Sequence, residues 1–215
     1  MEKLISKITI IDLVFFTLLA MFFTVPEHPV LSLVANAVAA MFCILVLMDT
    51  RENFTIHSVS VIYAVFSFLC FVSYFYSINP DASMRRIKSI PLLLILFCAG
   101  LNYFSRGENL QKFMMMYVGA ALLSCGYLFL TENIFSGETV GWTISNTNIV
   151  GTRFAFAVVF MVYFLLQKVK LWKWLIAAVL VVFLFLTASR SSVFIMTISS
   201  ALLVIITFRQ KRKPI

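Results

Sequence analysis

Thr187-Ala188-Ser189-Arg190-Ser191-Ser192 lies between two apolar segments, Leu171 to Leu186 and Val193 to Phe208. The connection is too short to form a domain, so the sequence predicts two helices joined by a tight turn. Because each apolar segment is close to the length of a membrane span, the turn is expected at a membrane surface. A permanently charged guanidinium is costly there unless an anionic or polar group meets it. Arg190 is therefore a candidate functional residue.

The composition excludes a soluble domain. Of the 215 residues, 62% are hydrophobic and only 12% are charged, and the mean hydropathy is +1.01. These values are typical of a polytopic membrane protein. The four cysteines fall inside apolar segments, and His28 and His57 share no ligand spacing with each other or with a cysteine. The sequence predicts no disulfide framework, no metal site and no cofactor.

Eight apolar segments have the length expected of membrane-spanning helices, about 17 to 25 residues in most cases. They are residues 8–25, 30–48, 56–76, 89–104, 112–130, 149–166, 171–187 and 191–208. The first lacks a small-residue cleavage pattern and is interpreted as a retained span. We therefore expect an all-α transmembrane helix bundle that forms one integral membrane domain over residues 1–215.

The lysines and arginines of the short loops predict the orientation. With the amino terminus inside, the cytoplasmic side holds twelve of the seventeen: Lys3, Lys7, Arg51, Arg106, Lys112, Lys168, Lys170, Lys173, Arg209, Lys211, Arg212 and Lys213. Both termini are then cytoplasmic, and these cations face anionic lipid headgroups. The basic tail is interpreted as a stop-transfer anchor, and nucleic acid is not expected as a partner.

Five cations remain on the outer side, and each lies near the start of an inward-running helix. They are Arg85, Arg86, Lys88, Arg153 and Arg190. Helix amino termini carry unpaired N–H groups and the positive end of the helix dipole. If the three helix ends converge, they form an anion site. The alternatives are that Arg190 reaches lipid phosphate and that the three cations of residues 85–88 lie on the headgroups.

For the polar residues next to these cations, two roles are open, helix capping and ligand binding. Ser189, Ser191 and Ser192 either cap the last helix or donate hydroxyl groups to the same anion. Asn146 and Asn148 either cap the sixth helix or bind a sugar.

Three carboxylates also bear on the interpretation. Glu132 and Glu138 are the outer carboxylates best placed for acid–base chemistry, although solvent exposure is the simpler interpretation. Asp12, near the inner end of the first segment, is expected to hydrogen-bond a neighbouring helix.

Three motifs resemble those of the O-antigen ligase and O-antigen polymerase family. The segment 187–192 within Phe183–Phe194 resembles its TxSRxx signature, and Asn146-Thr147-Asn148-Ile149-Val150-Gly151 resembles its upstream N-x-N segment. Ser77-Ile78-Asn79-Pro80-Asp81, followed by a basic stretch, is similar to the earlier outer loop of that family. The resemblance covers about residues 60–208.

The resemblance implies glycosyl transfer on the outer face of the bacterial cytoplasmic membrane, without metal or nucleotide. The donor would be a polyprenyl-diphosphate-linked glycan, and the acceptor lipid A–core for a ligase or another lipid-linked glycan for a polymerase. Family arginines hold the diphosphate; Arg190 matches that position, and Arg153 matches it less closely.

This sequence departs from the family pattern in one respect. Family members usually continue for several more spans and carry an outer-loop histidine proposed as general base, which neither His28 nor His57 matches. We therefore expect a shortened member of the family. A small-anion transporter and a noncatalytic membrane partner remain as alternative functions.

Overall fold

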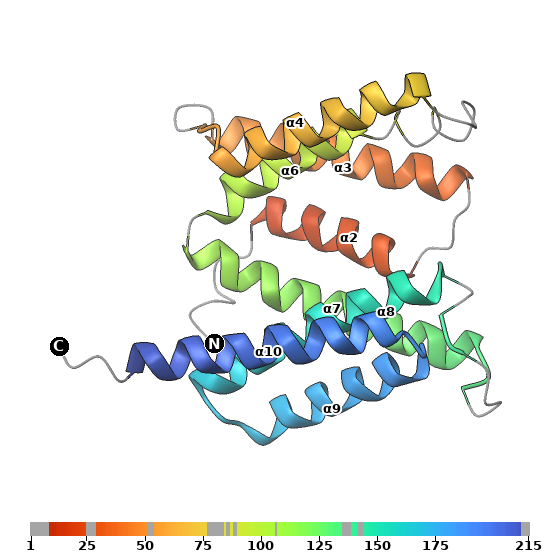
Figure 1. Ribbon diagram of the computed structural model, residues 1–215, viewed down its shortest axis with the longest axis vertical. Coiled ribbons are helices and arrows are strands. Elements are labelled where there is room, and N and C mark those ends of the chain that lie inside the picture. The colour runs from red at the N-terminus through yellow and green to blue at the C-terminus, as the bar shows by residue number, and fades with distance from the viewer. Residues whose placement is uncertain are drawn as a thin grey trace. The chain divides into compact units, whose positions relative to one another are not determined.

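The computed structural model describes residues 9–24, 29–50, 54–76, 84, 87, 90–105, 107–134, 139–141 and 144–211. Every regular element in these ranges is helical (Figure 1). The elements are α2 (Ile10–Thr24), α3 (Pro29–Thr50), α4 (Ser58–Ser73), the 3-10 turn η1 (Tyr74–Tyr76), α6 (Ile90–Phe104), α7 (Gly107–Thr131), α8 (Thr147–Gln167), α9 (Leu171–Leu186) and α10 (Arg190–Lys211). Each predicted span coincides with one of these helices, apart from a few residues at the ends.

Five of the described helices are long and apolar enough to cross a membrane. The qualifying segments are Leu33–Thr50, Ser58–Tyr76, Asn109–Thr131, Thr147–Gln167 and Arg190–Arg209. Three apolar helices, α2, α6 and α9, are shorter. At 1.5 Å per residue, a helix of 15 residues extends only about 22 Å, less than the bilayer core of about 30 Å. The fold class is therefore confirmed as a helical membrane protein, while eight spans and cytoplasmic termini stay predictions.

The chain forms two compact units. The first comprises residues 1–15 and 36–112 and contains α4 packed against α6. Its apolar core includes Phe15, whose ring centroid lies 4.9 Å from that of Phe42 and 4.8 Å from that of Phe104.

A buried polar cluster lies beside that aromatic core. Asp12 accepts hydrogen bonds from the Tyr103 hydroxyl at 2.5 Å and from Lys112 Nζ at 3.0 Å. The carboxylate is almost completely buried. The prediction that Asp12 hydrogen-bonds neighbouring helices is confirmed.

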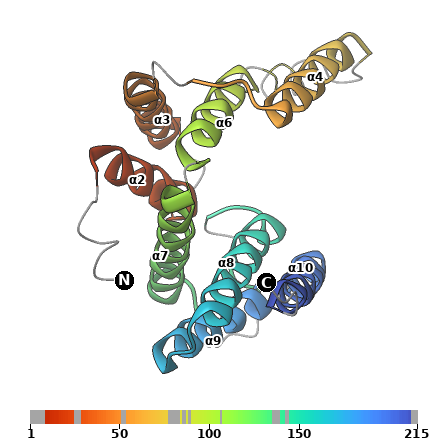
Figure 2. The same ribbon diagram turned by 90° about the vertical axis from the view of Figure 1, so that its left-hand side faces the viewer.

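The second unit comprises residues 16–35 and 113–215 and contains the predicted signature turn. In it α8 packs against both α9 and α10, as Figure 2 shows. The buried face of α8 presents Phe154 and Met161, and α9 contributes Leu180 and Leu184. Since α9 and α10 contact each other far less than either contacts α8, they separate beyond the turn that joins them.

Candidate functional site

The turn between α9 and α10 reverses the chain within three residues. Thr187 caps α9, and its N–H donates to Phe183 O at 3.2 Å. Ala188 then adopts a left-handed backbone conformation, with φ 51°. Ser189 precedes α10, and its Oγ accepts a hydrogen bond from Ser192 N at 3.4 Å. Arg190 is the first residue of α10, one position earlier than predicted.

The serine hydroxyls lie mainly inside the protein. Ser189 Oγ is 2.6 Å from Ser192 Oγ, and Ser192 Oγ also lies 3.1 Å from Thr152 Oγ1 and donates to Asn148 O at 3.3 Å. Ser192 has no exposed surface. Ser189 and Ser192 thus hold the turn against the start of α8, and the capping interpretation is confirmed for Ser189. Ser191 is exposed beside them.

Gly151 is the contact point of α8 with this turn. A Cβ at this position would lie 2.7 Å from Ser189 Cβ, 2.7 Å from Thr187 Oγ1 and 2.9 Å from Ser192 Oγ. Such distances leave no room for a side chain. This role of Gly151 was not predicted from the sequence, although a lone glycine in an apolar helix is a known signal of close helix packing.

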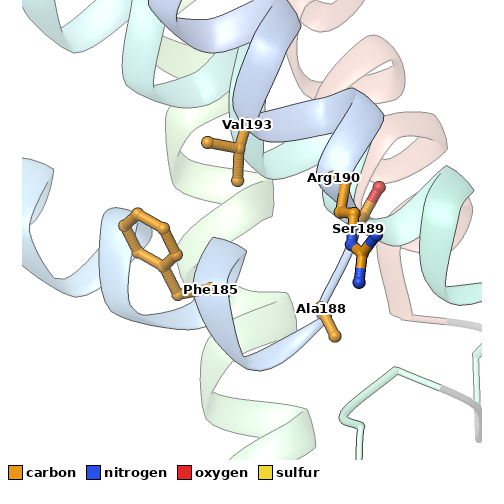
Figure 3. Close-up of a pocket in the computed structure, with 5 residues that line it drawn as sticks. All are labelled: Phe185, Ala188, Ser189, Arg190 and Val193. Carbon is orange, nitrogen blue, oxygen red and sulfur yellow. The ribbon is translucent and has the colours of Figure 1, made fainter.

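An open pocket of about 310 Å³ lies at the turn, where α9 and α10 begin to separate. Figure 3 shows Phe185 and Val193 on one side of it and Ala188, Ser189 and Arg190 on the other. The volume is at the lower end of the range for small-molecule sites. One side of the pocket is apolar, while the other carries an exposed guanidinium, a combination suited to a ligand with an anionic head and an apolar tail.

Arg153 lies on a different face of α8 from the one that meets the turn. Two residues along a helix correspond to about 200° of rotation, so Arg153 and Gly151 point in nearly opposite directions. The Arg153 guanidinium carbon lies 3.9 Å from the centroid of the Phe22 ring, a cation–π contact, and the residue is only 9% exposed. The structure therefore does not place Arg153 beside Arg190 as the predicted convergence required.

Arg153 was predicted near the start of the sixth helix, and in the structure it lies in the second turn of α8. The Asn146 side chain accepts a hydrogen bond from Asn148 N at 2.9 Å, so α8 begins at Thr147, and Arg153 falls in its second turn. The capping interpretation of Asn146 is confirmed. The Asn148 side chain is exposed, and the backbone carbonyl oxygen of Asn148 accepts hydrogen bonds from the Thr152 and Ser192 hydroxyl groups. Arg85, Arg86 and Lys88, the remaining predicted anion ligands, lie outside the described residues.

The segment before α8 is also tied to the turn by hydrogen bonds. Val140 N donates to Leu186 O at 2.9 Å, and Gly141 N donates to Glu132 Oε2 at 2.7 Å. Gly141 has φ 113°, a conformation that favours glycine. Glu132 therefore accepts a structural hydrogen bond and is not simply the solvated carboxylate expected from the sequence. Glu138 lies outside the described residues.

Comparison of the chain with known proteins found no relative. None of the protein-family models, curated proteins or solved structures matches the chain.

Proposed function

We propose that this protein is a membrane glycosyltransferase of the O-antigen ligase type. It transfers a glycan from a polyprenyl-diphosphate donor to lipid A–core on the outer face of the bacterial cytoplasmic membrane. The same site would serve an O-antigen or capsular polysaccharide polymerase, with a lipid-linked glycan as acceptor.

The pocket at the α9–α10 turn is the observation that supports this proposal best. It joins the exposed Arg190 guanidinium to the apolar side chains of Phe185 and Val193. A polyprenyl diphosphate has the same two parts, an anionic diphosphate and a hydrocarbon chain. A small-anion transporter would more usually bind its substrate near the membrane midplane between paired repeats, whereas this pocket lies at a helix end.

Arg190 would act on the leaving group of the transfer. The bond between the sugar carbon and the diphosphate oxygen breaks while a hydroxyl oxygen of the acceptor bonds to that carbon and gives up its proton to solvent water, so negative charge grows on the departing diphosphate. A guanidinium binds two phosphate oxygens at once and stabilises this charge more in the transition state than in the ground state. The positive end of the α10 dipole, at the same residue, adds to the effect.

The other predicted ligands have unequal support. Ser191 is exposed next to Arg190 and is available to a bound diphosphate, whereas Ser189 and Ser192 act by holding the turn. Arg153 faces Phe22, so its contribution to a diphosphate site at Arg190 is disfavoured by its position. The roles of Arg85, Arg86 and Lys88 stay predictions, as do eight spans with both termini in the cytoplasm.

The test is a gel of surface polysaccharide from a strain that lacks the gene, rescued with wild type, Arg190→Ala or Arg209→Ala. Arg209 is a matched control because it is also exposed and lies near the opposite end of the same helix. We expect wild type and Arg209→Ala to restore the glycan and Arg190→Ala to fail while inserting at a normal level. Single repeats in the deletion strain identify a polymerase, and bare core with accumulated lipid-linked polymer identifies a ligase. An unchanged ladder in the deletion strain, or full rescue by Arg190→Ala, would overturn the proposal.

A further inference from the structure

The connection between α8 and α9 is a short extended segment with two exposed lysines. Lys168 has φ −153° and ψ 114°, and Lys170 has φ −143° and ψ 141°. Because side chains alternate in extended backbone, the side chains of Lys168 and Lys170 project from one side of the segment and that of Val169 from the other. Both lysines are exposed, at the opposite end of α8 from the Arg190 pocket.

A third lysine, Lys173, holds its ammonium group close to this segment by hydrogen bonds. Lys173 is only 5% exposed, and its Nζ donates to Phe164 O at 2.6 Å and to Lys168 O at 2.9 Å. These carbonyl groups belong to the carboxyl end of α8, where helix carbonyls lack partners within the helix. The interpretation of Lys173 as a headgroup cation was therefore wrong, since the α8 carbonyl groups hold it inside. The charge of Lys173 nevertheless adds to the positive electrostatic potential around Lys168 and Lys170.

The sequence around these lysines supplies no acid to balance them. From Thr139 to Ile215 the chain contains no Asp or Glu, although it contains Arg153, Lys168, Lys170, Lys173, Arg190, Arg209, Lys211, Arg212 and Lys213. An ion pair between described residues, Asp12 with Lys112, lies in the other unit. An anion from outside this part of the chain is the available counterion.

Exposed apolar and indole side chains surround the lysines. Val169 is 71% and Leu171 77% exposed, and Trp172 and Trp174 are both exposed at the start of α9. Tryptophan is enriched where hydrocarbon meets headgroups. The patch of Lys168, Val169, Lys170, Leu171, Trp172 and Trp174, named the α8–α9 patch, therefore offers cations to phosphate and apolar groups to acyl chains.

We propose that the α8–α9 patch is a binding site for anionic phospholipids, whose phosphates are held by Lys168 and Lys170. The site is separate from the Arg190 pocket and does not depend on the proposed transferase activity. Each lysine near an anionic membrane surface contributes about 1 kcal/mol, which corresponds to about a fivefold preference for anionic over zwitterionic lipid.

The test uses the tryptophans of the patch as local reporters. The chain has three tryptophans, so Trp142→Phe leaves Trp172 and Trp174 as the emitters. The full chain is reconstituted in phosphatidylcholine with increasing brominated phosphatidylglycerol or brominated phosphatidylcholine, and the quenching gives the relative binding constant of the two lipids. In this background, the double variant Lys168→Gln with Lys170→Gln is compared with two controls. The first is the double variant Lys168→Arg with Lys170→Arg, and the second is Arg209→Gln.

We expect the preference for phosphatidylglycerol to fall about 25-fold in the double glutamine variant, five for each lysine. The preference for phosphatidylglycerol should persist in the Lys168→Arg, Lys170→Arg double variant. It should also persist in Arg209→Gln, which removes an exposed cation distant from the patch in sequence. An unchanged preference in the glutamine variant would overturn the proposal. A fivefold fall in Arg209→Gln, the effect expected of one lysine, would also overturn it, because the preference would then follow net charge alone.

Discussion

Replacing Gly151 with alanine tests the packing that positions Arg190. The added Cβ would lie 2.7 Å from Ser189 Cβ and 2.7 Å from Thr187 Oγ1. Ordinary carbon contacts are about 3.5–4.0 Å, so α8 and the turn must separate by about 1 Å. Neither neighbour yields easily, because Ser189 caps α10 and Thr187 Oγ1 donates to Leu184 O at 2.7 Å.

The expected loss follows from these contacts. Overpacking of this kind costs about 1–3 kcal/mol, and each broken hydrogen bond costs about 1 kcal/mol more. The better helix propensity of alanine returns about 1 kcal/mol. We expect Gly151→Ala to lower the free energy of unfolding by about 1–3 kcal/mol and to impair any activity that depends on Arg190.

Gly126→Ala is the matched control. Gly126 also lies within a long apolar helix, α7, but a Cβ there would meet no atom within 4 Å. This variant should be neutral or more stable by up to about 1 kcal/mol. The measurement is unfolding of the purified variants by sodium dodecyl sulfate in mixed micelles, followed by far-ultraviolet circular dichroism. If Gly151→Ala unfolds at the same detergent fraction as wild type, the close approach of α8 to the turn is incorrect.

Two further predictions concern the turn and the first unit. A left-handed conformation costs a non-glycine residue about 1–2 kcal/mol, and glycine loses about 0.5–1 kcal/mol of chain entropy, so Ala188→Gly should stabilise by about 0.5 kcal/mol. Ala188→Val should destabilise, and the reverse order in the same unfolding assay would contradict the observed φ. Asp12→Asn removes the carboxylate partner of Lys112 and should cost about 3–5 kcal/mol. The double variant with Lys112→Met should recover part of that loss, and additive losses in the double-mutant cycle would show that the two residues are not coupled.

The helices were predictable from the sequence because hydropathy and helix length decide them locally. A membrane requires every backbone polar group to be satisfied within the protein, so a long apolar segment has few choices besides a helix. The cap at Asn146 and the tight connection through Ser189 follow from residue types within three positions of each helix start. These features needed no knowledge of the neighbouring helices.

Whether an individual cation is buried or exposed was not predictable in this way. Lys173 and Arg153 look like Lys170 and Arg190 in the sequence, yet the first two are buried and the last two are exposed. Lys173 is buried because the carbonyl groups at the end of α8 accept its hydrogen bonds. Arg153 is buried because Phe22, more than a hundred residues away in the sequence, lies against its guanidinium.

The sequence by itself determined a helical membrane protein with a charged turn between its last two apolar segments, because apolar length and residue type act locally. Only the tertiary structure decided that Gly151 receives this turn, that Phe185, Val193 and Arg190 line one pocket, and that Arg153 faces elsewhere. These outcomes depend on which faces of α8, α9 and α10 pack together, and that choice is made by contacts between residues far apart along the chain.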